Sequence, residues 1–202
     1  MKELSTKERT IKLQEAEEAY AAFMDVILPG WEKKGALKGT PERIARMYVN
    51  ELLAGHYGPE PKITVFDNDS KYSGLVFQGN IAVKSMCEHH LMPFFGRAHV
   101  GIIPNKHGKI IGLSKINRIV EYYSRREQVQ EKLTQQIHDK LKELLPDSRG
   151  IAVTLECNHT CVSHRGIQDE STMKTAQMSG LFLDNSMSSR DEFYRMINDL
   201  TK

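Results

Sequence analysis

The chain has 202 residues, with acidic and basic side chains nearly in balance. That length is enough for one domain with a hydrophobic core, extended by a helical segment. The formal net charge of only +2 argues against a nucleic-acid-binding protein, which normally carries a strongly basic surface. Any anionic ligand must therefore be met by a local cluster of cations.

The first helical region is charged from its start and gives no sign of a membrane protein. The segment MKELSTKERTIKLQEAEEAY lacks the apolar core of a signal peptide. No apolar run approaches the ~20 residues that a membrane span needs. The chain has three cysteines, an odd number, which argues against a disulfide scaffold. We therefore expect no membrane association and a reducing, cytoplasmic location.

The first third of the sequence predicts helices. Over residues 6–28, apolar side chains recur at steps of three and four, as on one face of an amphipathic helix, and Pro29-Gly30 ends this pattern. Thr40-Pro41 is a typical helix start, because threonine accepts from a free backbone N–H and proline suits the first turn. This second helix is expected to extend to Gly55. We expect residues 1–60 to form an N-terminal helical region.

Residues 61–202 are expected to form a second, catalytic domain that begins with strands. Segments rich in β-branched and apolar residues are bounded there by glycine, proline, asparagine and aspartate, which is the pattern of β-strands. The segments are residues 62–66, 76–86 and 97–103.

Helices follow these strands. One is expected to open at Ser114, and a second, with an apolar stripe, runs from about Gln128 to a stop at Pro146. The strand pattern returns over residues 150–161, and a short helix is expected over residues 193–200. The order of the elements predicts an α+β fold, with an antiparallel sheet carrying helices on one face.

Residues that bind soft metals gather in two motifs, CEHH starting at Cys87 and HTC ending at Cys161. A turn can direct Cys87 and His90 at one ion, and an extended strand would place Cys157, His159 and Cys161 on one face because side chains alternate. We predict Cys87, His90 and Cys161 as zinc ligands, with the fourth position left for water as in catalytic sites. Zinc lowers the pKa of such a water from ~16 to ~7, which makes hydroxide available at neutral pH.

Two other interpretations of these residues stay open. A buried cysteine often packs as a small apolar residue, and we assign Cys157 to that class, although it lies close enough to be a spare ligand. A closed structural zinc site is the stronger rival, but the C-x-x-C pairs typical of such sites are absent. We expect His89 and His159 to flank the metal without binding it.

Three longer segments surround the motifs: SMCEHHLMPFFG, IGLSKINRIVEYYSRREQVQEKLTQQI and ECNHTCVSHRGIQ. Together with GTPERIARMYVNELL they resemble the GTP cyclohydrolase I family, from about Thr40 to Phe182. The resemblance implies that water adds to C8 of GTP, the imidazole ring opens and C8 leaves as formate. The ribose then rearranges to give 7,8-dihydroneopterin triphosphate, the first step of pterin and tetrahydrofolate-type biosynthesis.

The resemblance also assigns roles to single residues. Cys87, His90 and Cys161 match the zinc ligands of the family, the same three residues that the spacing indicates. His89 and His159 match its catalytic histidines. A histidine titrates near neutrality, so it can donate and accept protons in successive steps.

Substrate contacts follow from the same resemblance. Glu131 matches the carboxylate that accepts from N1–H and the 2-amino group of guanine, and leaving it unpaired would penalise adenine. Gln130 is expected to be a nearby polar contact. Cations for the triphosphate are expected at a helix N-terminus, whose free N–H groups and dipole favour phosphate, and beyond the second cysteine. These residues are Ser114, Lys115, Arg118 and Arg165, with Arg43 expected to reach the phosphates of a neighbouring subunit.

The sequence departs from the family pattern after Gly166, where GIQDESTMKTAQMSGLF is shorter than usual. We therefore assign no site residues from the resemblance beyond Gly166, that is, from Ile167 onward. The resemblance implies a tunnelling fold, in which two helices pack on one face of an antiparallel sheet. It further implies a homodecamer of two stacked pentamers with active sites between subunits. Ring closure has a physical logic, because it removes open sheet edges.

Other protein classes predict different features. Zinc deaminases carry an H-x-E…P-C-x-x-C pattern that this chain lacks. Another tunnelling-fold pterin enzyme would favour an all-histidine zinc site, which Cys87 and Cys161 oppose. A zinc module in a non-enzymatic interaction protein would close all four metal positions with protein ligands. The sequence does not choose between folate, biopterin and deazaguanine synthesis for the product.

Overall fold

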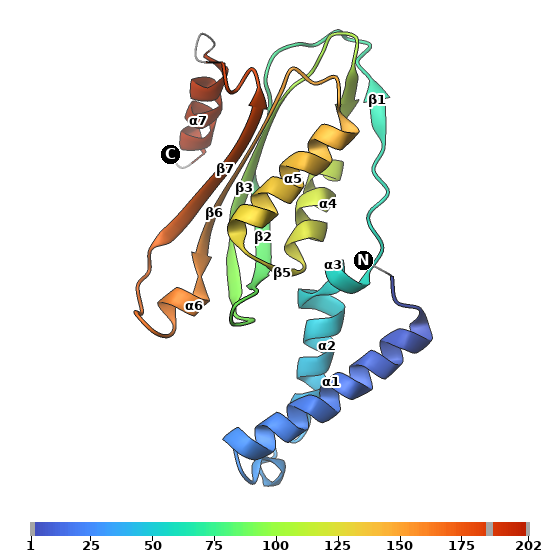
Figure 1. Cartoon of the computed structure of the whole chain (residues 1–202), viewed down its shortest axis with the longest axis vertical. Helices are drawn as coiled ribbons and strands as arrows, with labels where there is room; N and C mark the ends of the chain where they lie inside the picture. The colour runs from blue at the N-terminus through green and yellow to red at the C-terminus, as the bar shows by residue number, and fades with distance from the viewer. Residues whose placement is uncertain (1–2, 185–187, 201–202) are drawn as a thin grey trace. The chain divides into compact units, whose positions relative to one another are not determined.

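The computed structural model describes residues 3–184 and 188–200 (Figure 1). It divides into two compact units, Met1–Glu60 and Pro61–Lys202. Among the described residues, no helix has both the length and the apolar character that a membrane crossing requires.

The first unit is helical, as predicted. Helix α1 (Thr6–Ile27) starts with a capping box, in which Ser5 Oγ accepts from the Glu8 N–H and the Glu8 carboxylate accepts from the Ser5 N–H. It ends before Gly30, which has φ 77°, and a 3-10 turn η1 (Trp31–Lys33) follows. The apolar stripe of α1 is largely exposed, since Ile11 and Phe23 are 48% and 55% accessible.

The second predicted helix of this unit is broken into three pieces. Helix α2 (Thr40–Met47) starts where expected, with proline in its first turn. It widens into a π-helical turn, η2 (Tyr48–Leu52), and is followed by the short helix α3 (Ala54–Tyr57). The Leu53 N–H donates to Tyr48 O at 2.9 Å, which closes the wide turn. The expectation of one continuous helix to Gly55 was therefore wrong.

The second unit is built on a five-stranded sheet with the order β5-β2-β3-β6-β7. The α+β prediction is confirmed at that level, and four of the strands are antiparallel neighbours as expected. The short strand β5 is an exception, because it pairs in parallel with the end of β2. The strands are β2 (Val76–Cys87), β3 (Pro93–Ile103), β5 (Glu127–Gln128), β6 (Gly150–His159) and β7 (Thr172–Gly180), and β1 (Val65–Asp67) pairs separately with β4 (Lys109–Ile111).

Helices cover both faces of this sheet. Helices α4 (Leu113–Ser124) and α5 (Gln130–Leu144) bury their apolar sides against one face, in a core that includes Phe94 and Leu155. Helix α7 (Ser189–Asp199) packs Phe193 against the opposite face (Figure 1). The expected helices on one face are thus present, while the last helix lies on the other.

The strand that carries the second metal-binding motif ends earlier than predicted. Strand β6 stops at His159, and Cys161 lies in a short helix, α6 (Thr160–Ser163). The Thr160 hydroxyl donates to Pro93 O at 2.5 Å, and the His164 N–H donates to Thr160 O at 2.9 Å. These bonds turn the chain out of the sheet. The argument from alternating strand faces was therefore wrong for Cys161.

Candidate metal centre and active site

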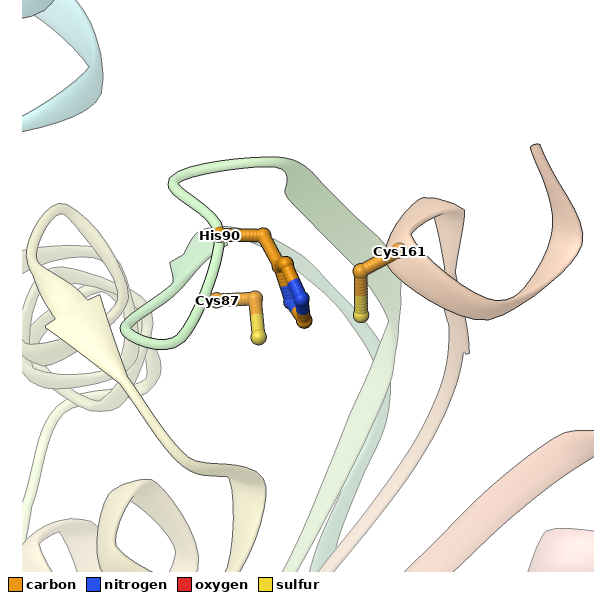
Figure 2. A group of neighbouring side chains, drawn as sticks. All are labelled: Cys87, His90 and Cys161. Atoms are coloured by element: carbon orange, nitrogen blue, oxygen red, sulfur yellow. The ribbon is translucent and has the colours of Figure 1, made fainter. Parts of the chain in front are cut away.

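Three side chains of metal-binding type converge from separate segments. Cys87 ends β2, His90 lies in the turn that follows, and Cys161 lies in α6. Their ligand atoms lie within 4.8 Å of one another, and Figure 2 shows the three side chains directed into one space. The turn after β2 is closed by Cys87 itself, whose N–H donates to Met92 O and whose carbonyl accepts from the Leu91 N–H, both at 2.8 Å.

The three residues fit a catalytic zinc ion. Two thiolates and one imidazole are a known donor set for such sites, and three protein ligands leave one position open. Burial is the largest cause of the raised pKa of Cys161, and the neighbouring Cys87 thiol raises it further. A divalent cation between the two sulfurs would reverse this effect by stabilising both thiolates.

Cys157 is not part of this cluster. It is 1% exposed within the sheet core, and burial raises the pKa of its thiol to about 12. A thiol held neutral in apolar surroundings packs as a small apolar side chain. The structure thus places Cys157 among the core residues and leaves three protein ligands at the metal centre among the described residues.

Two histidines flank the cluster. His89 Nδ1 lies 3.6 Å from Cys87 Sγ. His159, at the end of β6, stacks on Phe94 with ring centroids 4.5 Å apart and an interplanar angle of 9°. Burial lowers the pKa of His159, while the charge of Glu131 acts in the opposite direction. The His159 ring is therefore fixed by stacking and partial burial, whereas His89 is exposed and contacts the cluster through Cys87.

A cavity of about 510 Å³ opens beside these groups. Its volume is typical of small-molecule sites. Four residues predicted for catalysis or substrate binding line it, together with two of the predicted metal ligands and the first residues of β7. The lining includes Cys87, His89, Gln130, Glu131, His159, Cys161, Val129, Thr172 and Met173.

The acid and amide that open α5 differ in exposure. Glu131 is exposed on the cavity wall, and no described residue makes a hydrogen bond to its carboxylate. Gln130 is fully buried, and its amide bonds to protein atoms at both ends. The carboxylate is thus free to accept from a ligand, whereas the amide is already engaged.

The predicted phosphate-binding residues lie in different parts of the structure. Arg165 Nη1 donates to His90 Nε2 at 2.7 Å, so this arginine lies at the metal cluster. None of Ser114, Lys115 and Arg118 lines the cavity; they lie in the first turns of α4. The C-terminal end of that helix leads into β5 beside Cys87. At about 1.5 Å per residue, the start of α4 is a full helix length, roughly 18 Å, away from that end.

Arg43 belongs to the first unit, where its guanidinium donates to Ala36 O at 3.1 Å and to Thr40 Oγ1 at 2.9 Å. Lys115 Nζ reaches only a backbone oxygen, Lys62 O, at 3.5 Å. The acceptors of Arg43 and Lys115 in these bonds are carbonyl and hydroxyl oxygens, not carboxylates.

Residues of β7 were missed by the sequence analysis. Thr172 and Met173 line the cavity, and Thr175 bonds to Gln130. The stretch after Gly166 departs from the family pattern in length, which kept us from assigning site residues there.

Comparison with known proteins agrees with the resemblance in the motifs. The sequence profile of GTP cyclohydrolase I matches residues 16–198. Relatives named GTP cyclohydrolase 1 include one from Flavobacterium johnsoniae, 47% identical over 74% of this chain and 66% of the relative. Another, from Campylobacter jejuni, is 42% identical over 90% of this chain and 94% of the relative. A third, from Vibrio cholerae, is 46% identical over 78% of this chain and 72% of the relative. The chain therefore belongs to the GTP cyclohydrolase I family of enzymes.

Proposed function

We propose that this chain converts GTP to 7,8-dihydroneopterin triphosphate and formate with the help of a zinc ion. The observation that carries the proposal is the convergence of Cys87, His90 and Cys161 within 4.8 Å, at a cavity that also holds Glu131. A metal-binding cluster and a free carboxylate in one cavity match the two needs of this substrate, activated water at C8 and recognition of guanine.

Cys87, His90 and Cys161 would hold the ion. Zinc in such a site supplies a water ligand with a pKa of ~7, and so a hydroxide nucleophile at neutral pH. Cys157 lies away from the cluster and no described histidine or acid adds a fourth protein ligand, so these three residues would leave a coordination position for water. Thiolate ligands must stay reduced, which favours a reducing compartment such as the cytoplasm.

Glu131 is proposed to select guanine. Its carboxylate is an acceptor for the adjacent N1–H and 2-amino donors of that base. Adenine offers no such pair, so it would leave the carboxylate desolvated and unpaired, which is costly. His89 and His159, held beside the metal position, are proposed to move protons during ring opening and the later rearrangement.

The triphosphate is proposed to lie between protomers. Arg165 is at the metal end of the cavity, whereas Ser114, Lys115 and Arg118 lie at the far end of α4. A neighbouring copy that presents its own α4 start to this cavity would complete the site. Within the part of the chain that the structure describes, β7 pairs only with β6 and β5 only with the end of β2, so the sheet has edges for such contacts. We propose the homodecamer of the family, with Arg43 also contributed across an interface.

Incubation of the purified chain with GTP tests the proposal. We expect formate and a neopterin triphosphate in equal amounts, with zinc bound at one ion per chain. Release of ammonia with a xanthosine product would instead indicate a deaminase. A zinc-containing protein that leaves GTP unchanged would indicate a structural metal module.

A further inference from the structure

The buried amide of Gln130 has only one possible orientation. Its Nε2 lies 3.2 Å from Leu155 O and 3.0 Å from Met173 O. Carbonyl oxygens only accept hydrogen bonds, so the NH₂ group must face them. The amide oxygen then faces His159 Nε2, at 2.9 Å. A flipped amide would set its oxygen against these two carbonyl oxygens and lose both bonds in a buried site.

This orientation determines where the hydrogen of the His159 ring lies. An amide oxygen only accepts, so Nε2 must donate and must carry the hydrogen. The neutral ring then has its lone pair on Nδ1. No described residue makes a hydrogen bond to Nδ1, while Phe94 holds the ring by stacking. Nδ1 is therefore the ring nitrogen left for a ligand in the cavity.

Two threonines close a loop of hydrogen bonds on Gln130. Thr134 Oγ1 donates to Gln130 O at 2.8 Å, so it must accept from Thr175 Oγ1, which lies 2.6 Å away. Thr175 Oγ1 also lies 3.1 Å from Gln130 Nε2, so the two amide hydrogens are shared among three acceptors, Leu155 O, Met173 O and Thr175 Oγ1. The loop starts and ends on Gln130 and joins α5 to β7. Each bond has one permitted direction, and bonds in such a loop strengthen one another.

We propose that Gln130 is a positioning residue, not the substrate contact that the sequence suggested. It holds His159 in the Nε2–H tautomer, and Thr134 and Thr175 hold Gln130. Nδ1 is then the ring nitrogen without a hydrogen-bond partner among the described residues, and Gln130 holds the opposite side of the ring. The expected effect of this orientation on turnover rests on the proposed GTP reaction.

The first test compares Gln130→Met with His138→Leu in the zinc-loaded protein. Met keeps the length of the side chain but removes both the acceptor and the donors. His138 is a matched control, because it is also buried on α5 and also bonds to β7, through Ser179 Oγ at 3.0 Å, without contacting His159. We expect Gln130→Met to lower kcat by about 10- to 100-fold, as for other residues that orient a functional histidine. We expect its KM for GTP to stay within about twofold.

The control should lose stability to heat but keep kcat. A raised KM with kcat kept in Gln130→Met would show that the amide binds substrate and would overturn the proposal. An equal loss of kcat in His138→Leu would show that any broken α5–β7 bond has this effect, and would also overturn it. Absence of turnover in the unmodified chain would instead contradict the proposed function.

A second test does not depend on turnover. Nitrogen-15 NMR of histidine-labelled, zinc-loaded protein reports which ring nitrogen carries hydrogen, and the His159 signals are identified by their loss in His159→Ala. We expect a protonated Nε2 and an unprotonated Nδ1 in the unmodified chain. Gln130→Met should give a mixture of tautomers. A hydrogen on Nδ1 in the unmodified neutral ring would overturn the assignment.

Discussion

The two ends of the proposed active site differ in how one chain supplies them. The metal end is complete, because β2, the following turn, β6, α6 and the start of α5 bring their residues to one cavity. The phosphate end is not, because Ser114, Lys115 and Arg118 lie at the start of α4 and outside that cavity. The difference favours the proposal that one protomer supplies the metal site and the catalytic residues, whereas phosphate recognition would require a second protomer.

The largest effect is expected from removal of a proposed metal ligand. In Cys161→Ser we expect the loss of zinc and a fall in kcat of at least about 10⁴-fold, because the metal generates the nucleophile. Metal analysis and formate release measure the two effects. Cys157→Ala is the matched control, since Cys157 is a buried cysteine of β6, the strand that leads into α6, but lies outside the cluster. Full activity of Cys161→Ser without zinc would refute the ligand assignment.

Substitution of a histidine that flanks the metal cluster should lower turnover without loss of the metal. We expect His159→Ala to keep zinc and to lose about 10³-fold in kcat, within the usual contribution of general acid–base catalysis. The metal should stay because Cys87, His90 and Cys161 remain in place. Metal analysis of the folded variant is the decisive measurement, and a loss of zinc would make His159 a ligand.

A smaller effect is expected at the guanine end of the cavity. Glu131→Gln replaces a charged acceptor with an amide that also presents a donor. Hydrogen bonds to charged groups contribute about 1.5–3 kcal/mol, so kcat/KM for GTP should fall by about 10- to 100-fold. Zinc content should not change. The neighbouring exposed Lys132→Ala is a useful control on the same turn of α5, and an unchanged kcat/KM in Glu131→Gln would remove this carboxylate from guanine recognition.

The metal cluster could be predicted from sequence because it depends on residue types more than on geometry. Cysteine and histidine in two short motifs indicated the ligands, although the path of the chain at Cys161 was wrong. Strand periodicity does not show where a strand ends. Here the end depends on Thr160, whose hydroxyl bonds to Pro93 O across 67 positions of sequence.

The surroundings of Gln130 could not be predicted in the same way. Its partners come from β6 and β7, between 25 and 45 positions further along the chain. Strand β7 is an edge strand with many exposed polar residues, so it lacks the apolar alternation that marks a half-buried strand. The burial of Gln130 beside His159 depends on tertiary contacts. The local sequence at the start of α5 resembles that of any polar helix and therefore does not indicate it.

Mixing two inactive variants, one altered at the metal end and one at the phosphate end, tests most directly whether one protomer supplies both ends of the proposed active site. Arg118→Ala alone should raise the KM for GTP by about 10-fold, since one charged phosphate contact is lost. Combined with Lys115→Ala it should give a chain with an intact metal end and little activity at low GTP. If the α4 start serves a neighbouring cavity, this chain and Cys161→Ser complement each other. Random mixing in equal amounts in a ring should restore about a quarter of the sites, since each needs one intact part from each chain type.

The complementation requires co-refolding or co-expression, so that mixed assemblies form. Activity in the mixture well above the sum of the separate chains would show that the two ends come from different protomers. If both ends came from the same protomer, no assembly of these chains would contain a complete site, and the mixture would stay at the sum. In that case α4 of the same chain would have to move its first turn toward Cys87. That movement conflicts with the burial of Ile116 and Ile119 against the sheet, which holds α4 along its length.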